Sequence, residues 1–314
     1  MAMFRKSAFE DERMKQNKHS DLEKNRRITG IAFVIPEFIL IVIFMVIPLV
    51  SVIRYSFTDW DGISRSMNYI GLRNYTELKD IDGTGEMIVA TVVYALGVTV
   101  ITNLLAFIQA LLLDKKGKGR INRSLMRSLL FFPSLLSGTI VGILWHIMYN
   151  YNTGIINSIL KGVGMSPVNW LETYGLTNVA VIVASAWAST GLCMVVYMAG
   201  LQSIPQELYE SAEIDGASKW DALRHITIPL MASSITINVI TSTIAAFKAY
   251  ELPYFISEGL PGHSTLLITQ RIYFYGFEGR NYGRGSALAV ILIIIIVLIS
   301  LIQLAYLKKR EDIY

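Results

Sequence analysis

Six long apolar stretches constrain the fold of this chain more than any other feature of its sequence. Each has at least 20 mostly apolar residues, the length that an α-helix needs to cross a bilayer at a rise of about 1.5 Å per residue. They are Ile31–Ile53, Met87–Leu113, Leu129–Met148, Val179–Leu201, Leu230–Tyr250 and Ser286–Leu307. A backbone in hydrocarbon must satisfy its own polar groups, and the alternating pattern of a β-barrel is absent. The sequence therefore predicts an all-α polytopic membrane protein with six transmembrane helices.

The composition agrees with a membrane protein. The chain is 53% hydrophobic and 17% charged, whereas soluble proteins are about a quarter charged. About thirty polar residues precede the first apolar stretch, so we expect no cleavable signal peptide. The net charge of +4 is expected to divide between the two membrane sides rather than to bind nucleic acid. The single cysteine, Cys193, lies in an apolar stretch and excludes an intramolecular disulfide.

Lysine and arginine predict the orientation. Nineteen of them lie in the tails and loops on one side of the spans, and eight lie in the loops on the other side. By the positive-inside rule, both termini are cytoplasmic. We accordingly divide the chain into a basic cytoplasmic tail (1–30), a six-helix transmembrane domain (31–307) that faces lipid, and a short cytoplasmic tail (308–314).

One loop on the basic side is acidic. Segment 202–229 has two basic residues against five acidic ones, on the side where anionic lipid favours basic residues. Chance in a short loop is one interpretation. The other is that this loop contacts protein instead of lipid headgroups.

The same loop has the start and stop signals of two short helices. Ser203 and Gln206 have the spacing of a capping box. Gly216, after Asp215, ends that helix, and Ser218 with Asp221 caps a second one that leads through Pro229 into the fifth span. These signals predict a rigid protrusion from the membrane domain.

This loop also resembles a known motif. Glu210-Ser211-Ala212-Glu213-Ile214-Asp215-Gly216-Ala217-Ser218, followed by Ile226-Thr227-Ile228-Pro229, is similar to the EAA loop of binding-protein-dependent ABC importer permeases. The spacing from Gly216 to Ile226 matches that motif. Ser211 replaces an alanine, Ile228 replaces a leucine, and Leu223 stands where an aromatic residue is common.

Weaker similarities elsewhere point to the carbohydrate-importer permeases, such as the maltose-system membrane subunits. These segments are Ser56-Phe57-Thr58, Gly71-Leu72-x-Asn74-Tyr75, Ala199-Gly200-Leu201-Gln202-Ser203-Ile204-Pro205 and Gly259-Leu260-Pro261-Gly262-x-Ser264-Thr265. The resemblance implies an ABC importer permease fold in the bacterial cytoplasmic (inner) membrane. It does not indicate which sugar is carried.

The resemblance also implies the partners. A second, different permease would form a heterodimer with this chain, two ATPase subunits would bind ATP and magnesium, and an extracytoplasmic binding protein would deliver the sugar. This chain is expected to bind no cofactor, and Gly117-Lys118-Gly119 lacks the spacing of a phosphate loop. The EAA coupling loop, 203–229, would contact the ATPase. Its candidate coupling residues are Glu210, Ser211, Ala212, Asp215, Gly216, Ala217, Ile226 and Pro229.

Polar and aromatic residues in the fourth and fifth spans are candidates for the solute path, where the resemblance also places solute contacts. Both spans carry further polar groups, Tyr197, Asn238 and Thr241. The candidates are Trp187, Ser189, Thr190, Ser242, Lys248 and Tyr250. A cationic lining through Lys248 would suit an acidic sugar.

Each of these candidates has a plainer interpretation. Serine and threonine often bond helix to helix, and Tyr250 fits an interfacial aromatic belt. Lys248 and Glu251 have the spacing of a simple ion pair at the membrane surface.

Other features of the spans indicate packing rather than chemistry. Gly138-x-x-x-Gly142 allows close approach of another helix, and Trp145-His146 fits a membrane interface. The sequence shows no metal-ligand spacing and no catalytic serine motif, so we expect no catalytic residue and no metal site.

The sequence thus predicts the permease subunit of an ATP-driven ABC importer, forming half of the path for a sugar or oligosaccharide. An importer for amino acids or phosphodiester-type solutes is the closest alternative. A membrane enzyme or a proton-coupled secondary transporter would need buried acids, and Glu37 is the one carboxylate at depth.

Overall fold

The computed structural model describes residues 26, 29, 31–80, 83–114, 120–259 and 264–311. Most of the basic tail, the segment Gly117-Lys118-Gly119, residues 260–263 and residues 312–314 lie outside the described residues. The chain forms two compact units, which divide between Tyr55 and Ser56.

The described part of the first unit contains one membrane-length helix. It runs from Ile31 to Tyr55, 25 residues with a mean hydropathy of 2.8, and contains a π-helical turn, η1 (Val42–Val46), followed by α2 (Ile47–Tyr55). A helix that is apolar on all sides is typical of a membrane span, and this helix covers the first predicted span.

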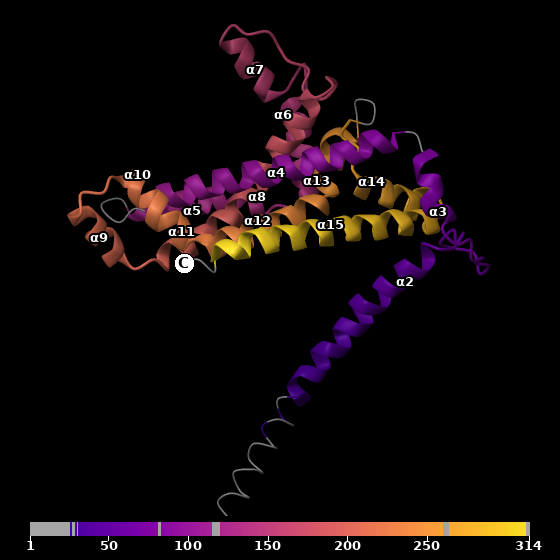
Figure 1. Ribbon diagram of the computed structural model, residues 1–314. Coiled ribbons are helices and arrows are strands. Elements are labelled where there is room, and N and C mark those ends of the chain that lie inside the picture. Colours follow the sequence, from indigo (N-terminus) through magenta and orange to yellow (C-terminus); the bar gives the residue numbers. More distant parts are fainter. Residues whose placement is uncertain are drawn as a thin grey trace, which may run out of the picture. The chain divides into compact units, whose positions relative to one another are not determined.

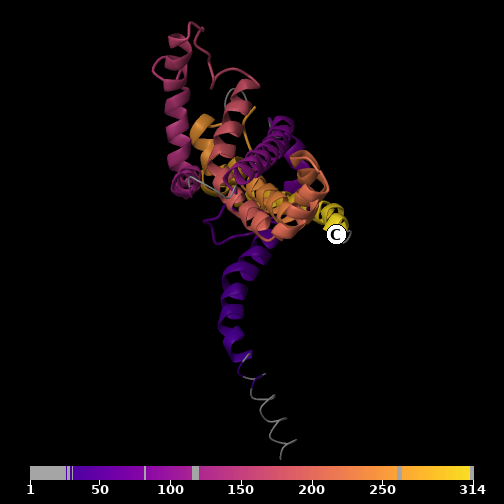
Figure 2. The ribbon, with the colours of Figure 1, turned by 90° about the vertical axis from the view of Figure 1, so that its left-hand side faces the viewer.

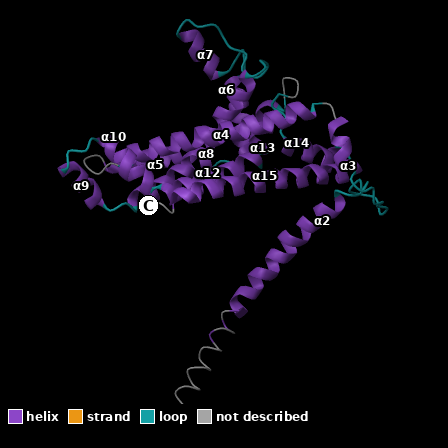
Figure 3. Cartoon of the chain, viewed as in Figure 1, coloured by secondary structure: helices purple, strands orange, loops and turns teal. Residues whose placement is uncertain are grey.

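Among the residues that the structure describes, the second unit consists of helices joined by loops (Figure 3), with one isolated antiparallel bridge between Thr58 and Tyr69. Its long helices are α4 (Thr84–Leu113), α8 (Leu176–Gln202) and α15 (Tyr282–Glu311). The shorter elements before α8 are α3 (Arg73–Thr76), η2 (Glu77–Asp80), α5 (Arg120–Phe131), η3 (Phe132–Leu135), α6 (Gly138–Tyr149) and α7 (Ile155–Gly162). Those between α8 and α15 are α9 (Gln206–Ile214), α10 (Lys219–Ala222), η4 (Leu223–Thr227), α11 (Ile228–Leu230), α12 (Ala232–Phe247), α13 (Glu251–Ser257), α14 (Ile268–Tyr273) and η5 (Phe274–Glu278).

The long helices lie side by side (Figure 1). Helix α4 packs along α8, and α12 packs against both α4 and α15. Small residues make this approach close: a Cβ atom on Gly97 of α4 would lie 2.8 Å from Ile182 Cδ1 of α8. Small residues at helix contacts are typical of membrane bundles, where packing replaces the hydrophobic effect as the driving force. Helices α4, α8 and α15 cover the second, fourth and sixth predicted spans and are long and apolar enough to cross a membrane.

The third predicted span, Leu129–Met148, is wrong as a straight helix. Segments Arg123–Leu135 and Gly138–Tyr149 meet at an angle of 99°, so α6 turns away from α5 (Figure 2). Pro133 lies in the short 3-10 turn η3, and Leu136 is extended (φ −82°, ψ 147°). Ser137 then caps α6, because its side chain accepts a hydrogen bond from the Ile140 amide at 3.3 Å. Hydropathy counts apolar residues and does not detect such a restart.

The fifth predicted span, Leu230–Tyr250, is also broken. Segments Lys219–Leu230 and Ala232–Phe247 are bent by 67° at Met231, and α12 ends at Phe247. Pro229 has no amide hydrogen, and its ring crowds the carbonyl four residues earlier. The π-helical turn η4, Leu223–Thr227, contains that carbonyl and ends just before the proline.

The predicted close approach at Gly138 and Gly142 is confirmed. Helix α6 packs against α13, and a Cβ atom on Gly142 would lie 2.7 Å from Phe255 Cβ and 3.0 Å from the Leu252 carbonyl oxygen. On the same helix, His146 Nδ1 lies 2.8 Å from the Ile256 carbonyl oxygen. Both contacts hold the short helix α13 against α6.

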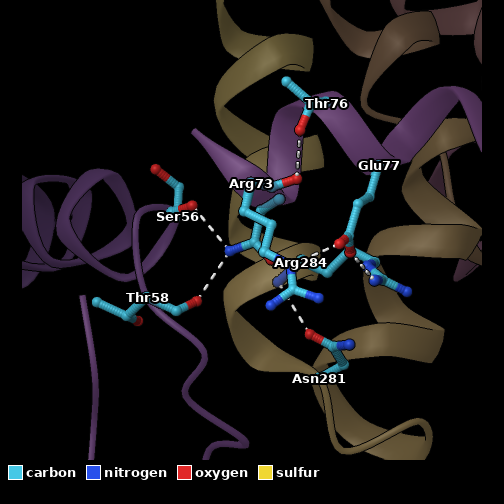
Figure 4. Close-up of polar contacts among 8 residues, drawn as sticks. Ser56, Thr58, Arg73, Thr76, Glu77, Asn281 and Arg284 are labelled. Atoms are coloured by element: carbon cyan, nitrogen blue, oxygen red, sulfur yellow. Dashed lines mark hydrogen bonds and ion pairs between the residues drawn. The ribbon is translucent and has the colours of Figure 1, made fainter. Parts of the chain in front are cut away.

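The segment between Ser56 and α3 is fastened by a buried asparagine. Asn74, 4% exposed, donates from Nδ2 to the carbonyl oxygens of Ser56 at 2.9 Å and Thr58 at 2.8 Å (Figure 4). These two hydrogen bonds hold residues 56–58 against α3.

An ion-pair cluster ties the same segment to the start of α15. Glu77 accepts hydrogen bonds from Arg73 Nε at 2.6 Å and from an Arg284 Nη at 2.7 Å (Figure 4). These two guanidinium groups, Arg73 first, hold the pKa of Glu77 below its ordinary value of 4.5. Gly283 lies so close to Thr58 that no side chain fits between them. The first loop and the last span therefore form one body.

Candidate functional site

The turn between α9 and α10 ends the first helix of the 203–229 segment as predicted. After α9, the Gly216 amide donates to the Glu213 carbonyl at 3.1 Å, and the Ala217 amide donates to the Ala212 carbonyl at 2.9 Å. Gly216 has a φ of +80°. Left-handed backbone after a helix favours glycine, which has no Cβ atom to clash.

One predicted cap is confirmed and the other is wrong. Ser218 and Asp221 form a reciprocal capping box at the start of α10. Ser203 caps nothing, because Pro205 occupies the cap position of α9 and the Ser203 hydroxyl donates to the Gly200 carbonyl at 2.7 Å.

The tip of this segment presents apolar side chains to its surroundings. Ile214 is 86% exposed and Trp220 is 67% exposed, on the two sides of Gly216. Glu210 is exposed and accepts a hydrogen bond from Gln206 at 3.0 Å. Of the candidate coupling residues, these are exposed: Glu210, Ser211, Asp215, Gly216 and Ala217; these are half-buried: Ala212, Ile226 and Pro229.

The coupling segment (residues 203–229) stands off the bundle but is joined to it. Helices α9 and α10 lie at the end of the bundle where α15 ends (Figure 1). A cavity of about 580 Å³ separates them from the ends of α4 and α8. The Tyr209 hydroxyl lies 2.9 Å from the hydroxyl of Thr227, which is buried, and Met231 at the 67° bend is fully buried. The segment thus connects to α12 through packed side chains.

A second cavity, of about 340 Å³, lies inside the bundle where the third predicted span is broken. The extended residues between η3 and α6 open this space among α4, α8 and α12. Its wall consists of Tyr94, Val98, Thr102, Pro133, Ser134, Leu136, Gly138, Val141, Ala188, Ser189, Leu192, Cys193, Thr241, Ser242, Ala245, Ala246, Ala249 and Leu252. The wall is apolar with several hydroxyl groups, and none of these lining residues is charged. Small-molecule sites have this size and composition.

The structure brings two of the six solute-path candidates into the cavity wall. Ser189 of α8 and Ser242 of α12 line it. Thr190 is buried, and its hydroxyl donates to the Ala186 carbonyl of its own helix at 2.5 Å. Lys248 and Tyr250 follow α12 outside the wall, although their neighbours Ala249 and Leu252 line it.

Trp187 belongs to an aromatic row beside the cavity rather than to its wall. Its ring meets Trp145 edge to face at 5.7 Å, Trp145 contacts Tyr149 at 5.1 Å, and Tyr149 contacts Trp170 at 5.8 Å. Trp170, in the loop after α7, in turn donates to Asn157, which is fully buried within α7. The row links α8 to the segment between α6 and α8.

Lys248 forms no ion pair with Glu251 in the described part of the chain. Its side chain is exposed, and Glu251 instead accepts from the Thr139 hydroxyl at 3.4 Å. The alternative of a simple surface pair is therefore wrong.

Two further residues of the cavity region escaped the sequence analysis. Asn103 donates to Ser242 at 2.8 Å, and Thr102 contributes to the wall; both belong to α4, where no solute contact was expected. The signal was present, since an asparagine inside an apolar span is costly unless it has a partner.

No group of three or more potential metal ligands occurs among residues 31–80, 83–114, 120–259 and 264–311.

Residues 102–311 match the family model of the binding-protein-dependent transport system inner membrane component. This match covers more than half of the chain and includes the coupling segment and all of the cavity wall except Tyr94 and Val98. The chain belongs to this family and is a permease subunit of an ABC transporter in the inner membrane.

Two relatives and one solved structure agree. The chain is 31% identical to the probable starch degradation products transport system permease protein AmyD of Thermoanaerobacterium thermosulfurigenes, over 89% of this chain and 94% of that one. It is 30% identical to the trehalose/maltose transport system permease protein MalF of Thermococcus litoralis, over 95% and 100%. The fold is similar to a chain of a bacterial ABC transporter involved in the import of the acidic polysaccharide alginate, with a TM-score of 0.79 and 21% identity, over 91% and 96%.

Proposed function

We propose that this chain is one of two permeases in an ATP-driven importer, and that it forms half of the path for a sugar or oligosaccharide. One observation carries this proposal. The coupling segment stands off the bundle with an apolar tip, and it is joined to α12, the helix that lines an uncharged cavity with hydroxyl groups in its wall. An extracytoplasmic binding protein delivers the solute, and both chain termini are on the cytoplasmic side with the coupling segment.

The coupling segment is suited to contact the ATPase subunits. Ile214 and Trp220 are large apolar groups with little cover from the described chain, and exposed apolar anchors are typical of protein interfaces. Glu210 beside them can accept charge-assisted hydrogen bonds from basic groups. ATP and magnesium are bound by the ATPase, and this chain supplies the contact.

Movement of the coupling segment reaches the cavity by a short route. Tyr209 joins α9 to Thr227, η4 leads through the bend at Met231 into α12, and α12 carries Ser242 in the cavity wall. Since packed helices move as bodies rather than deform, a displacement at α9 shifts this wall. That is the mechanical step which opens and closes the path.

The cavity favours a sugar over an ionic solute. Its wall offers hydroxyl groups and apolar surface, which suit the hydroxyls and carbon faces of a sugar ring. A charged solute would be desolvated there without a partner. The relatives are named for transport of starch degradation products, trehalose and maltose, and Lys248 lies outside the wall, so an acidic sugar has little support.

We further propose that the second permease is a different chain, so that the two permeases form a heterodimer. The support for this is the resemblance to the carbohydrate-importer permeases, which usually pair two different chains. The helix Ile31–Tyr55, with a mean hydropathy of 2.8, needs lipid or protein around its apolar surface.

Co-purification tests the complex. Tagged chain, expressed with the permease and ATPase genes of its own operon, is expected to bring down both proteins. Ile214→Asp is expected to lower ATPase recovery by roughly 30-fold, since an interface anchor contributes about 2 kcal/mol or more. Ile63→Asp is the control, because Ile63 is 74% exposed in the first loop, far along the chain from the coupling segment. Equal ATPase recovery with both variants, or none with the parent, would refute the docking proposal.

A further inference from the structure

Ser242 is the cavity-wall hydroxyl whose hydrogen bonds are most completely defined. Its Oγ donates to the carbonyl oxygens of Asn238 at 2.6 Å and Val239 at 3.2 Å and accepts from Asn103 Nδ2 at 2.8 Å. A serine hydroxyl has one hydrogen and two lone pairs. A carbonyl oxygen accepts only, so the single hydrogen of Ser242 is directed at these two backbone carbonyls of its own helix. One lone pair is then left for a solute.

Two residues behind Ser242 hold this arrangement. The Asn103 amide also donates to the Thr99 carbonyl at 2.8 Å, which fixes the amide orientation because its oxygen cannot face another oxygen. That oxygen accepts from the Tyr197 hydroxyl at 2.7 Å. Tyr197 is 2% exposed. Its ring packs edge to face against the ring of Phe107, with 5.5 Å between the ring centroids.

The neighbouring hydroxyl group of Thr102 forms no hydrogen bond within the described chain. Thr102 lines the cavity and is fully buried. Its Oγ1 has no hydrogen-bond partner among the residues that the structure describes. A buried hydroxyl without a partner costs free energy, and a solute hydroxyl at this place would remove that cost.

We propose that Asn103 and Tyr197 are positioning residues that hold Ser242 as a hydrogen-bond acceptor, so that the permease selects solutes presenting a hydroxyl donor there. This inference rests on the proposed sugar transport and adds a specificity determinant from α4 and α8. It predicts discrimination against a group that cannot donate, such as fluorine or a carboxylate.

The test uses the whole complex, reconstituted in proteoliposomes with its binding protein and ATP. The probes are maltose, trehalose and maltotriose; for the one that is imported, analogues with one hydroxyl replaced by fluorine are compared. Fluorine cannot donate a hydrogen bond. Because the binding protein is the same in every sample, the ratio of hydroxyl to fluoro uptake in a variant, divided by that ratio in the parent, reports the permease alone.

In the parent, one fluoro position is expected to be taken up roughly three- to tenfold less well through loss of one hydrogen bond at the permease. In Asn103→Leu, no amide donates to Ser242, so its hydroxyl can turn the hydrogen from the Asn238 and Val239 carbonyls toward the solute, and this discrimination falls toward onefold while the other positions keep theirs. In Tyr197→Phe, Thr99 still holds the amide, and the discrimination falls part of the way. Tyr149→Phe is the matched control. It removes a hydroxyl that bonds the Ala180 carbonyl at 3.0 Å outside the cavity wall, and it should keep the parent ratio.

Three outcomes would overturn the inference. Parent-like discrimination in both Tyr197→Phe and Asn103→Leu shows that these residues do not hold Ser242 as an acceptor. A loss of discrimination in Tyr149→Phe as well shows a general packing effect. If none of the three sugars is imported with ATP, the sugar assignment itself fails and the inference fails with it. Import with unchanged ratios refutes the positioning role alone.

Discussion

Replacing Gly216 by valine is expected to reduce ATP-driven uptake by roughly 30-fold or more while leaving the protein in the membrane. The glycine has a φ of +80°, where a β-branched residue is strained by about 1–3 kcal/mol. A Cβ atom there would meet no atom of the described chain within 4 Å, so the bundle itself is undisturbed. The loss arises because the turn no longer presents α9 and α10 to the ATPase, which costs an interface about 2 kcal/mol or more.

Gly164→Val is a matched control for this prediction. Gly164 has the same φ of +80° and equally open surroundings, but it follows α7 and lies outside the coupling segment. Uptake, membrane content and ATPase recovery are measured for both variants. Normal uptake by Gly216→Val, or equal loss in both variants, would contradict the role of the coupling turn.

The second large effect concerns the packing of α6 on α13. Gly142→Leu places its Cβ 2.7 Å from Phe255 Cβ and 3.0 Å from the Leu252 carbonyl oxygen, and backbone cannot yield as a flexible side chain does. Overpacking of this kind costs about 1–3 kcal/mol. The melting midpoint of the purified protein is therefore expected to fall by roughly 2–10 °C, with a lower yield from the membrane.

Gly162→Leu serves as the comparison, since a Cβ atom there meets nothing within 4 Å. Its melting midpoint should stay near that of the parent. A parent-like midpoint for Gly142→Leu would show that α6 and α13 are not held together through this glycine.

Much of the fold follows from local sequence patterns. The lengths of the apolar stretches predict where helices cross the membrane, and the spacing of Ser218 and Asp221 predicts a cap, because both depend on neighbours along the chain. The breaks at Leu136 and Met231 were missed. Each depends on where a proline and the next capping residue direct the backbone, and hydropathy averages over that direction.

The candidate site was predicted less completely than the fold. Ser189 and Ser242 are in the cavity wall, but sequence alone does not separate them from Thr190, which bonds its own helix. The choice depends on helix rotation within the bundle. Asn103 reaches Ser242 across 139 positions of sequence, a contact that only the packing of α4 against α12 creates.

The two cavities and the broken spans together suggest why this bundle is divided as it is. The break before α6 lies in the wall of the cavity that we propose for the solute, and the bend at Met231 joins the coupling segment to the helix that carries Ser242. A straight third span would not form this wall, and a straight fifth span would not set the coupling segment at an angle to α12. The departures from the simple six-helix prediction are thus the places where the proposed transport occurs.

Uptake of radiolabelled maltose, trehalose or maltotriose into proteoliposomes is the most direct test of the proposed importer. The vesicles contain this chain, its partner permease and the ATPase, with the binding protein outside. We predict uptake with ATP inside the vesicles, none with a non-hydrolysable analogue, and no effect of collapsing the proton gradient. Uptake that runs on a proton gradient without ATP or binding protein would contradict the account.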